Sequence, residues 1–196
     1  MIGVDEVGRG CLAGPLLVVA ARQISELPQG LKDSKLITRK QRLKILNLLS
    51  ISCSFGEGWV TCSEIDKLGL SKALTLGGRR ALKNIGAAID EGIILDGKFN
   101  YLPAKFKNSV AIIKADNSVP LVSAASIYAK VTRDSYMTKL ADSYPEYSFE
   151  NHVGYGTKAH MLALQTHGAL KYVHRQSFSP VVNLKRSGVL NIKTAG

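Results

Sequence analysis

The chain has 196 residues, and its 26 Lys and Arg against 15 Asp and Glu give a formal net charge of +11. With 45% hydrophobic and 21% charged residues, the composition excludes a disordered chain, and no apolar stretch reaches the ~18 residues of a membrane span. Three cysteines without a CxxC pair exclude a disulfide framework and a zinc ribbon. We therefore expect one compact, soluble, cytoplasmic domain.

Two strands joined by a glycine-rich turn are expected to open the chain. Residues 1–5 are compatible with a strand, and residues 16–22 are a run of Leu, Val and Ala. Thr38 caps a segment in which apolar residues recur at near-helical spacing, which predicts an amphipathic helix. Residues 52–60 predict a third strand.

The rest of the chain predicts helices that alternate with two short strands. Helices are expected over residues 63–68, residues 71–85, a segment that opens at Pro120, and residues 157–166. The two strands, residues 92–95 and 110–114, each end just before an aspartate. This order predicts an α/β fold with a mixed sheet of about five strands flanked by helices.

The last quarter of the chain is purely cationic. Residues 151–196 hold six basic and no acidic side chains, all four histidines, and interleaved aromatic residues. Such a segment attracts polyanions by counterion release, and nucleic acid is the favoured partner. A basic surface kept for solubility is the alternative. A membrane surface is disfavoured, because no segment combines a basic face with a broad apolar one.

Four acids stand at or just beyond the ends of predicted strands: Asp5, Glu6, Asp96 and Asp116. Sheets of this class bind ligands at strand ends, and oxygen ligands without Cys or His favour Mg²⁺ or Mn²⁺. Taken singly, such an acid is more often a surface carboxylate or a helix cap, and only the set of four, inside a cationic protein, favours a metal site. Because a strand alternates its side chains, Asp5 and Glu6 cannot both face one side of a regular sheet. We therefore expect the first strand to end or bulge between them.

The turn Gly8-Arg9-Gly10 follows these two acids. Its glycines remove side-chain bulk, so backbone amides could approach a sugar or phosphate closely. An ordinary turn is the alternative interpretation.

Several motifs together resemble bacterial ribonuclease HII, the type 2 ribonuclease H. The resemblance spans residues 2 to about 180, and its motifs occur in the family's order. They are GVDEVGRG (3–10), LAGP (12–15), DSK (33–35), LDG (95–97), KAD (114–116), SAASIYAKVTRD (123–134), GYGT (154–157) and HRQSF (174–178).

The resemblance implies a ribonuclease H-like fold with a helical C-terminal part over residues 1–180, and we expect a basic, irregular tail over 181–196. It implies an endonuclease that cuts the RNA-containing strand of RNA/DNA hybrids and incises 5′ to ribonucleotides embedded in duplex DNA, in DNA repair. The four acids named above occupy the catalytic positions and would hold two Mg²⁺ or Mn²⁺ ions about 4 Å apart. The products would be a 3′-hydroxyl and a 5′-phosphate.

The resemblance also assigns substrate contacts. Gly8, Arg9 and Gly10 would surround the 2′-hydroxyl, and Tyr155 would stack on the following deoxyribose. Such a site can reject a substrate that lacks the hydroxyl by ~10⁴-fold. The predicted phosphate contacts, which fix register without reading sequence, are Lys35, Arg175 and Ser177.

Cys11 and Val153 replace the family's usual proline and basic residue. Asp134 matches a family motif, but a helix from Pro120 would carry it ~20 Å along the axis, so we interpret it as a structural partner of Lys130. The tail has no clamp-binding motif, and the family suggests a monomer.

Two other functions remain open from the sequence. One is a ribonuclease HIII-like hybrid nuclease, which carries an extra N-terminal domain in its family. The other is a nucleic-acid-binding module without catalysis, although four clustered carboxylates would weaken DNA binding unless metal neutralised them.

Overall fold

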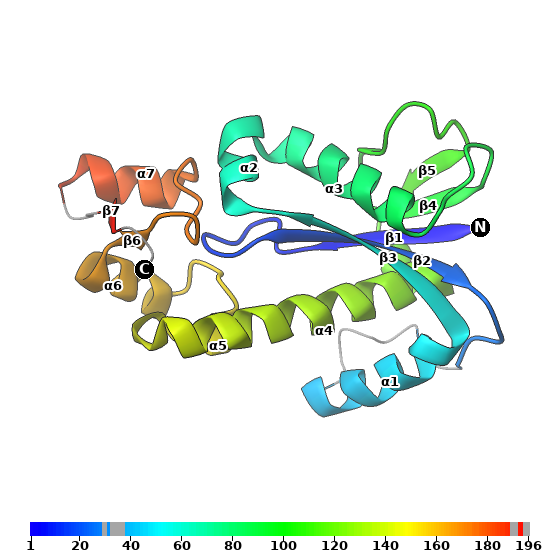
Figure 1. The fold of residues 1–196 in the computed structure, drawn as a ribbon, viewed down its shortest axis with the longest axis horizontal. Coiled ribbons are helices and arrows are strands. Elements are labelled where there is room, and N and C mark those ends of the chain that lie inside the picture. Colours follow the sequence, from blue (N-terminus) through cyan, green and yellow to red (C-terminus); the bar gives the residue numbers. More distant parts are fainter. Residues whose placement is uncertain (29–30, 32–37, 189–191, 194–196) are drawn as a thin grey trace. The chain divides into compact units, whose positions relative to one another are not determined.

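The computed structural model describes residues 1–28, 31, 38–188 and 192–193 (Figure 1). The chain forms two compact units. The sheet unit comprises residues 1–7, 17–59 and 74–132, and the helical unit comprises residues 8–16, 60–73 and 133–196. Because the two units interleave along the chain, the boundary expected near residue 180 does not separate them and stays a prediction.

A five-stranded sheet in the order β3-β2-β1-β4-β5 confirms the predicted mixed sheet. Its strands are β1 (Ile2–Val7), β2 (Leu16–Gln23), β3 (Cys53–Val60), β4 (Ile93–Asp96) and β5 (Ser109–Ile112). β1 pairs antiparallel with β2 and parallel with β4, and β4 pairs parallel with β5. The carboxyl ends of β1, β4 and β5 therefore lie at one edge of the sheet.

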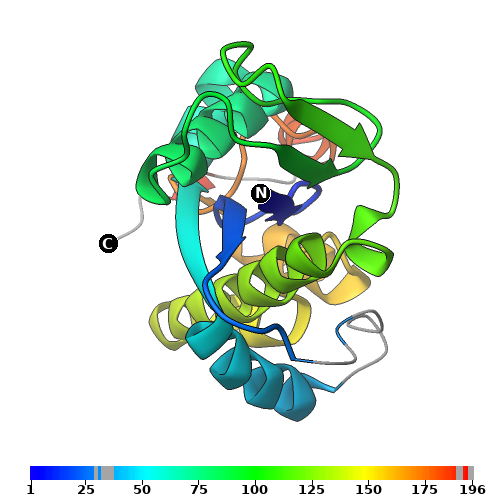
Figure 2. The same cartoon turned by 90° about the vertical axis from the view of Figure 1, so that its right-hand side faces the viewer.

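Helices cover both faces of this sheet (Figures 1 and 2). They are α1 (Arg39–Ser52), α3 (Leu70–Asn84) and α4 (Pro120–Ser143). The side chains of β2 alternate, so that Val18 and Ala20 pack with α3 while Leu17 and Val19 pack with α4 and α1. A Cβ at Gly3 would lie 2.3 Å from a backbone carbon of α4, so this glycine allows the helix to lie close against β1.

The helical unit contains short elements. Its own helices are α2 (Cys62–Leu68), α5 (Phe149–His152), α6 (Lys158–His167) and α7 (Ser179–Arg186), beside two short strands, β6 (Ala169–Leu170) and β7 (Ile192–Lys193). Single 3-10 turns are η2 (Ala115–Asn117), in the sheet unit, and η3 (Pro145–Tyr147).

The irregular tail expected from residue 181 is wrong for its first part, because α7 continues to Arg186. Pro180 lies in the first turn of this helix, where its missing N–H costs nothing, and Val181 is fully buried with Leu12 and Leu164. Burial of one apolar face thus orders a segment whose composition alone suggests a tail. Within the described ranges, no helix is long and apolar enough to cross a membrane.

Candidate active site

Three of the four predicted acids lie at the carboxyl-terminal edge of the sheet. Val4 of β1 pairs with Leu95 of β4, so Asp5 and Asp96 follow at equivalent positions of neighbouring parallel strands. Asp116 lies in η2, just after β5, and is 1% exposed. The amide of Ala115 donates a hydrogen bond of 2.8 Å to Asp96 Oδ1, which links η2 to the end of β4.

The expected end or bulge between Asp5 and Glu6 is wrong. β1 pairs with β2 in unbroken register through Val7, so the two acids lie on opposite faces of the sheet. Glu6 Oε2 accepts a hydrogen bond of 3.0 Å from the hydroxyl of Tyr101, on the α3 side. Asp5 is hydrogen-bonded to Ser126 of α4 on the other side.

The electrostatic surroundings of Asp5 favour a cation. Its side chain is 8% exposed, and burial raises the pKa of its carboxyl to about 8. The negative charges of Glu6 and Asp96 contribute to this raised pKa, while the hydrogen bond from Ser126 opposes it. Because both charges acting on Asp5 are negative, a divalent cation at this edge would relieve the repulsion.

These oxygens do not form a closed metal cage. Among the residues that the structure describes, no three His, Cys, Asp or Glu side chains are grouped so as to hold a metal ion by themselves. Mg²⁺ in phosphoryl-transfer enzymes is commonly bound by one or two carboxylates together with substrate phosphates and water. The all-oxygen donor set therefore fits an ion shared with substrate.

The glycine turn after β1 belongs to the helical unit. Gly8 has φ +84°, and a Cβ there would lie 2.2 Å from Arg133 Nε. Arg9 and Gly10 are exposed, and a Cβ at Gly10 would meet nothing within 4 Å. The turn is thus fixed on one side by a buried arginine and open to solvent on the other.

Arg175, predicted as a phosphate contact, lies inside the helical unit. Its side chain is 0% exposed and donates to the carbonyl oxygens of Gly8 at 2.7 Å and Arg9 at 2.9 Å. A side chain without exposed surface cannot touch a phosphate in this conformation. The resemblance assigned Arg175 to a phosphate, whereas backbone carbonyls satisfy its guanidinium in this structure.

The remaining predicted contacts differ in accessibility. Tyr155 is 42% exposed, and its amide donates to His152 O at 2.9 Å. Ser177 is exposed, but its hydroxyl and amide both donate to Asp66 Oδ1, at 2.6 and 2.9 Å. Lys35 lies outside the described residues, and the roles of these three side chains stay predictions.

Sequence reasoning missed several polar partners. Ser126 and Arg133 lie within the run 123–134, which the motif comparison could have singled out. Tyr101 and Asp66 carry no signal in the sequence, because their partners are distant along the chain. Tyr101 is 95 positions from Glu6, and Asp66 is 110 positions from Gln176. The proposed pairing of Asp134 with Lys130 stays a prediction.

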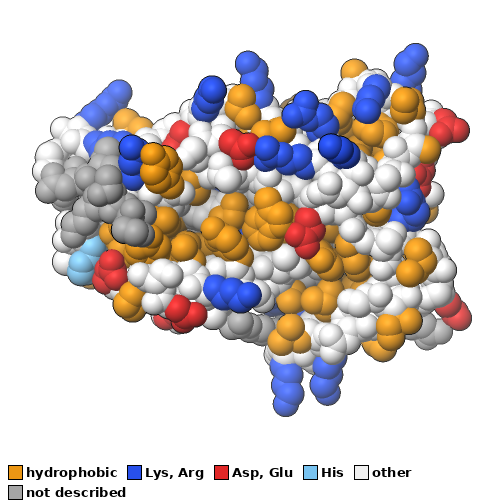
Figure 3. Space-filling view, in the orientation of Figure 1, with side chains coloured by type: hydrophobic (Ala, Val, Ile, Leu, Met, Phe, Trp, Pro, Cys, Tyr) orange, Lys and Arg blue, Asp and Glu red, His pale blue; other side chains and the backbone are white. Residues whose placement is uncertain are grey.

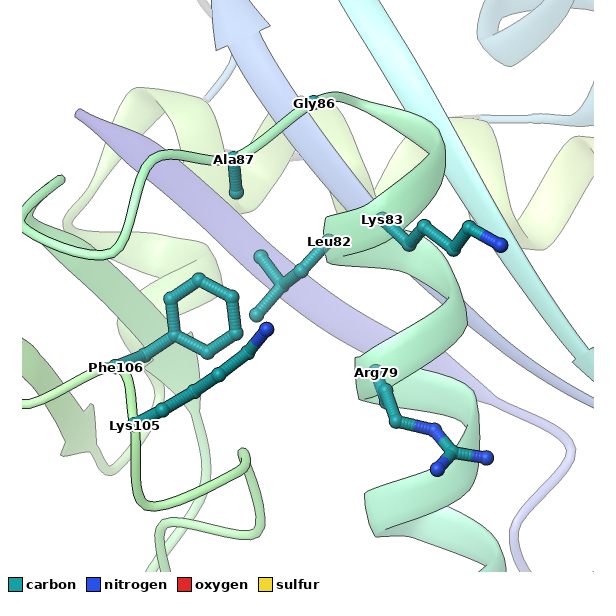
Figure 4. A pocket seen from close by; sticks show the side chains of 7 residues that line it. All are labelled: Arg79, Leu82, Lys83, Gly86, Ala87, Lys105 and Phe106. Carbon is teal, nitrogen blue, oxygen red and sulfur yellow. The ribbon is translucent and has the colours of Figure 1, made fainter.

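A separate pocket of about 370 Å³ lies in the sheet unit at the end of α3 (Figure 4). Leu82 and Phe106 line it, and Lys105 Nζ lies 5.1 Å from the centre of the Phe106 ring. Lys83 extends away from Phe106, so the basic side chains around this pocket do not converge (Figure 4). Lys and Arg side chains also follow the side of the molecule where α3 lies (Figure 3). None of the four acids lines this pocket.

Comparison with known proteins identifies the family of this chain. The family described as Ribonuclease HII matches residues 2–181. The Ribonuclease HII of Fusobacterium nucleatum subsp. nucleatum is 40% identical over 183 residues, which cover 91% of this chain and 85% of the relative.

Solved structures share the fold. The ribonuclease H2 of Pyrococcus horikoshii OT3 matches with a TM-score of 0.76 at 25% identity, covering 97% of this chain and 99% of that chain. A chain of the PCNA:RNase HII complex from Archaeoglobus fulgidus gives a TM-score of 0.69 at 23% identity, covering 97% of this chain and 89% of that chain.

The fold and these matches define a metal-dependent endoribonuclease, which is a hydrolase. The chain belongs to the ribonuclease HII family, as its motifs predicted. Membership supports ribonuclease H activity on RNA/DNA hybrids. The family match and the 40% identical relative support the ribonuclease HII interpretation of the sequence. A solved ribonuclease HIII structure also shares the fold, with a TM-score of 0.68 at 18% identity.

Proposed function

We propose that the chain incises duplexes on the 5′ side of ribonucleotides, both within RNA/DNA hybrids and at single ribonucleotides embedded in DNA. The products are a 3′-hydroxyl and a 5′-phosphate, and the role is ribonucleotide excision repair. The observation that carries this proposal is the acidic edge of the sheet, where Asp5 and Asp96 stand at equivalent positions of neighbouring parallel strands and Asp116 follows β5.

The four acids Asp5, Glu6, Asp96 and Asp116 are proposed to hold two divalent ions together with the scissile phosphate. Bound there, Mg²⁺ or Mn²⁺ would supply Lewis-acid activation of the attacking water and stabilise charge on the leaving oxygen. The chain's part is to fix the ligands. Ser126 and Tyr101 orient Asp5 and Glu6 from opposite faces, and the Ala115 amide orients Asp96.

Ribose recognition is assigned to the turn of residues 8–10. The open space at Gly10 leaves room for a sugar, and amides in a glycine-rich turn can approach a hydroxyl closely. A site that hydrogen-bonds the 2′-hydroxyl discriminates against DNA, because its polar groups are left unsatisfied when the hydroxyl is missing. The exposed ring of Tyr155 is assigned to stacking on the next sugar.

The decisive experiment uses a labelled DNA duplex with one embedded ribonucleotide, with and without Mg²⁺. Asp96→Asn should abolish incision and retain duplex binding, because it removes a metal ligand but no cationic side chain. The matched control is Asp90→Asn, an exposed acid of the same unit, which should cut normally. Binding without incision by the wild-type protein in Mg²⁺ would instead favour a non-catalytic module.

A further inference from the structure

A short segment of the helical unit contacts the glycine turn through Arg175. The guanidinium donates to Gly8 O and Arg9 O at 2.7 and 2.9 Å, and also to Gly14 O at 2.9 Å. The Arg175 amide donates to Leu12 O at 2.8 Å. This one residue therefore holds residues 8–14 at both ends and in the middle.

The preceding residue, His174, reaches Tyr155 through a second histidine. The Leu170 amide donates to His174 Nδ1 at 2.9 Å, so the proton of this ring lies on Nε2. His174 Nε2 lies 3.2 Å from His160 Nε2, which therefore accepts, and His160 carries its proton on Nδ1. That nitrogen lies 2.9 Å from Tyr155 O. Each hydrogen bond fixes the tautomer of the next ring, and the chain of bonds ends at the backbone of Tyr155.

The two recognition segments also meet directly. The Leu12 amide donates to Gly154 O at 2.8 Å, while Arg133 donates to Val153 O at 2.8 Å and to Ala13 O at 3.1 Å. Val153 has φ +45°, a left-handed conformation that β-branched residues rarely adopt. The surrounding hydrogen bonds must maintain this conformation, so the position of Tyr155 depends on residues 12–13.

We propose that His174 and Arg175 are positioning residues that hold the Gly8–Gly10 turn and Tyr155 as one rigid unit, so that ribose recognition and sugar stacking are energetically coupled. The proposal rests on the function assigned above to these two segments. When two groups are held in one arrangement, their conformational entropy is lost on folding, so no further entropy is lost when each of them contacts the substrate. Arg175 and His174 thus act through other residues.

Double-mutant cycles measure this coupling. Gly10→Ala and Tyr155→Ala are made singly and together, and kcat/KM is measured on the duplex with one ribonucleotide. In the wild-type background the two effects should deviate from multiplicative behaviour by at least about fivefold. The Arg175→Lys background keeps the positive charge but loses the planar guanidinium. In this background the effect of the double substitution on kcat/KM should equal the product of the two single effects to within about twofold.

Arg22→Lys is the matched control background. Arg22 also donates to backbone carbonyls, those of Ile85 and Gly86, but lies in the sheet unit. Its coupling factor should equal that of the wild type. If Arg175→Lys lowers activity yet leaves the coupling factor unchanged, Arg175 has an ordinary structural role and the proposal is overturned.

A second measurement needs neither substrate nor an Arg175 variant. Amide hydrogen exchange is compared between the wild type and His160→Gln. The amides of Leu12 and Tyr155 should lose protection by the same factor, while the Ile65 amide, bonded to Thr61 O in the same unit, keeps its protection. Loss at Tyr155 alone would overturn the proposal. Absence of incision by the wild type would refute the proposed function and leave this exchange test intact.

Discussion

Acidification from pH 7 to pH 5 should destabilise the protein through two buried histidines. His160 and His174 are 0% exposed, and burial lowers their pKa values to about 4 and about 3. The ordinary histidine pKa is about 6.5. At pH values between the folded and the unfolded pKa, the unfolded chain binds protons that the folded chain does not. The free energy of unfolding therefore falls as the pH drops through this range.

The size of the effect follows from these values. With a pKa of about 6.5 unfolded and about 4 folded, His160 alone should lower the free energy of unfolding by about 2 kcal/mol between pH 7 and pH 5. Asp5, whose folded pKa is raised to about 8, changes stability in the opposite direction over the same range. The comparison must therefore cancel the contribution of Asp5.

The assay is urea unfolding of the wild type and His160→Gln at both pH values. Because Asp5 is present in both proteins, it drops out of the difference. The loss of stability on acidification should be about 2 kcal/mol smaller in His160→Gln. His167→Gln, at a partly exposed histidine, controls for removal of an imidazole. Equal losses in the wild type and His160→Gln would refute the reasoning.

Three further outcomes are expected. Gly8→Ala should lower the free energy of unfolding by about 2 kcal/mol or more, measured by thermal or urea unfolding, because φ is +84° and the methyl group would meet Arg133. Gly10→Ala should change the free energy of unfolding by less than about 0.5 kcal/mol, because its methyl group would meet nothing within 4 Å. The Gly10→Ala variant should nevertheless cut at single ribonucleotides at least about tenfold more slowly than the wild type. Equal stability of both variants would contradict this difference. Tyr155→Ala should weaken the preference for single ribonucleotides over long hybrids more than it weakens hybrid affinity, and an unchanged ratio of kcat/KM values would argue against stacking. Tyr101→Phe should lower kcat about threefold to tenfold while changing stability by about 1 kcal/mol, because it removes the hydrogen bond to Glu6; unaltered kinetics would show that this bond does not orient the acid.

The elements of the fold could be predicted because their causes are local. Thr38 accepts a hydrogen bond from the Gln41 amide and the Gln41 side chain accepts from the Thr38 amide, a capping box that begins α1 where the sequence placed it. The continuous apolar run of β2 and the small residues of α4 are likewise visible in the sequence. The family motifs added the identity of the candidate acids.

What the sequence could not predict depends on contacts between distant residues. Arg175 was expected to contact a phosphate, yet backbone carbonyls more than 160 positions away satisfy it inside the fold. The register of β1 was misjudged because the requirement that two acids share a face was imposed on the strand. Tyr101 and Asp66 gain their roles only from the path of the chain in space.

The unbroken course of β1 makes the acidic edge sensitive to two independent packing layers. Asp5 is hydrogen-bonded to α4, and Glu6 to the loop that bears Tyr101. A displacement of either layer would move one acid and leave its neighbour in place, altering the spacing between the two carboxylates without breaking the strand. Core substitutions beneath α4 and beneath the loop would therefore adjust the two proposed metal ligands separately, from opposite faces of the sheet.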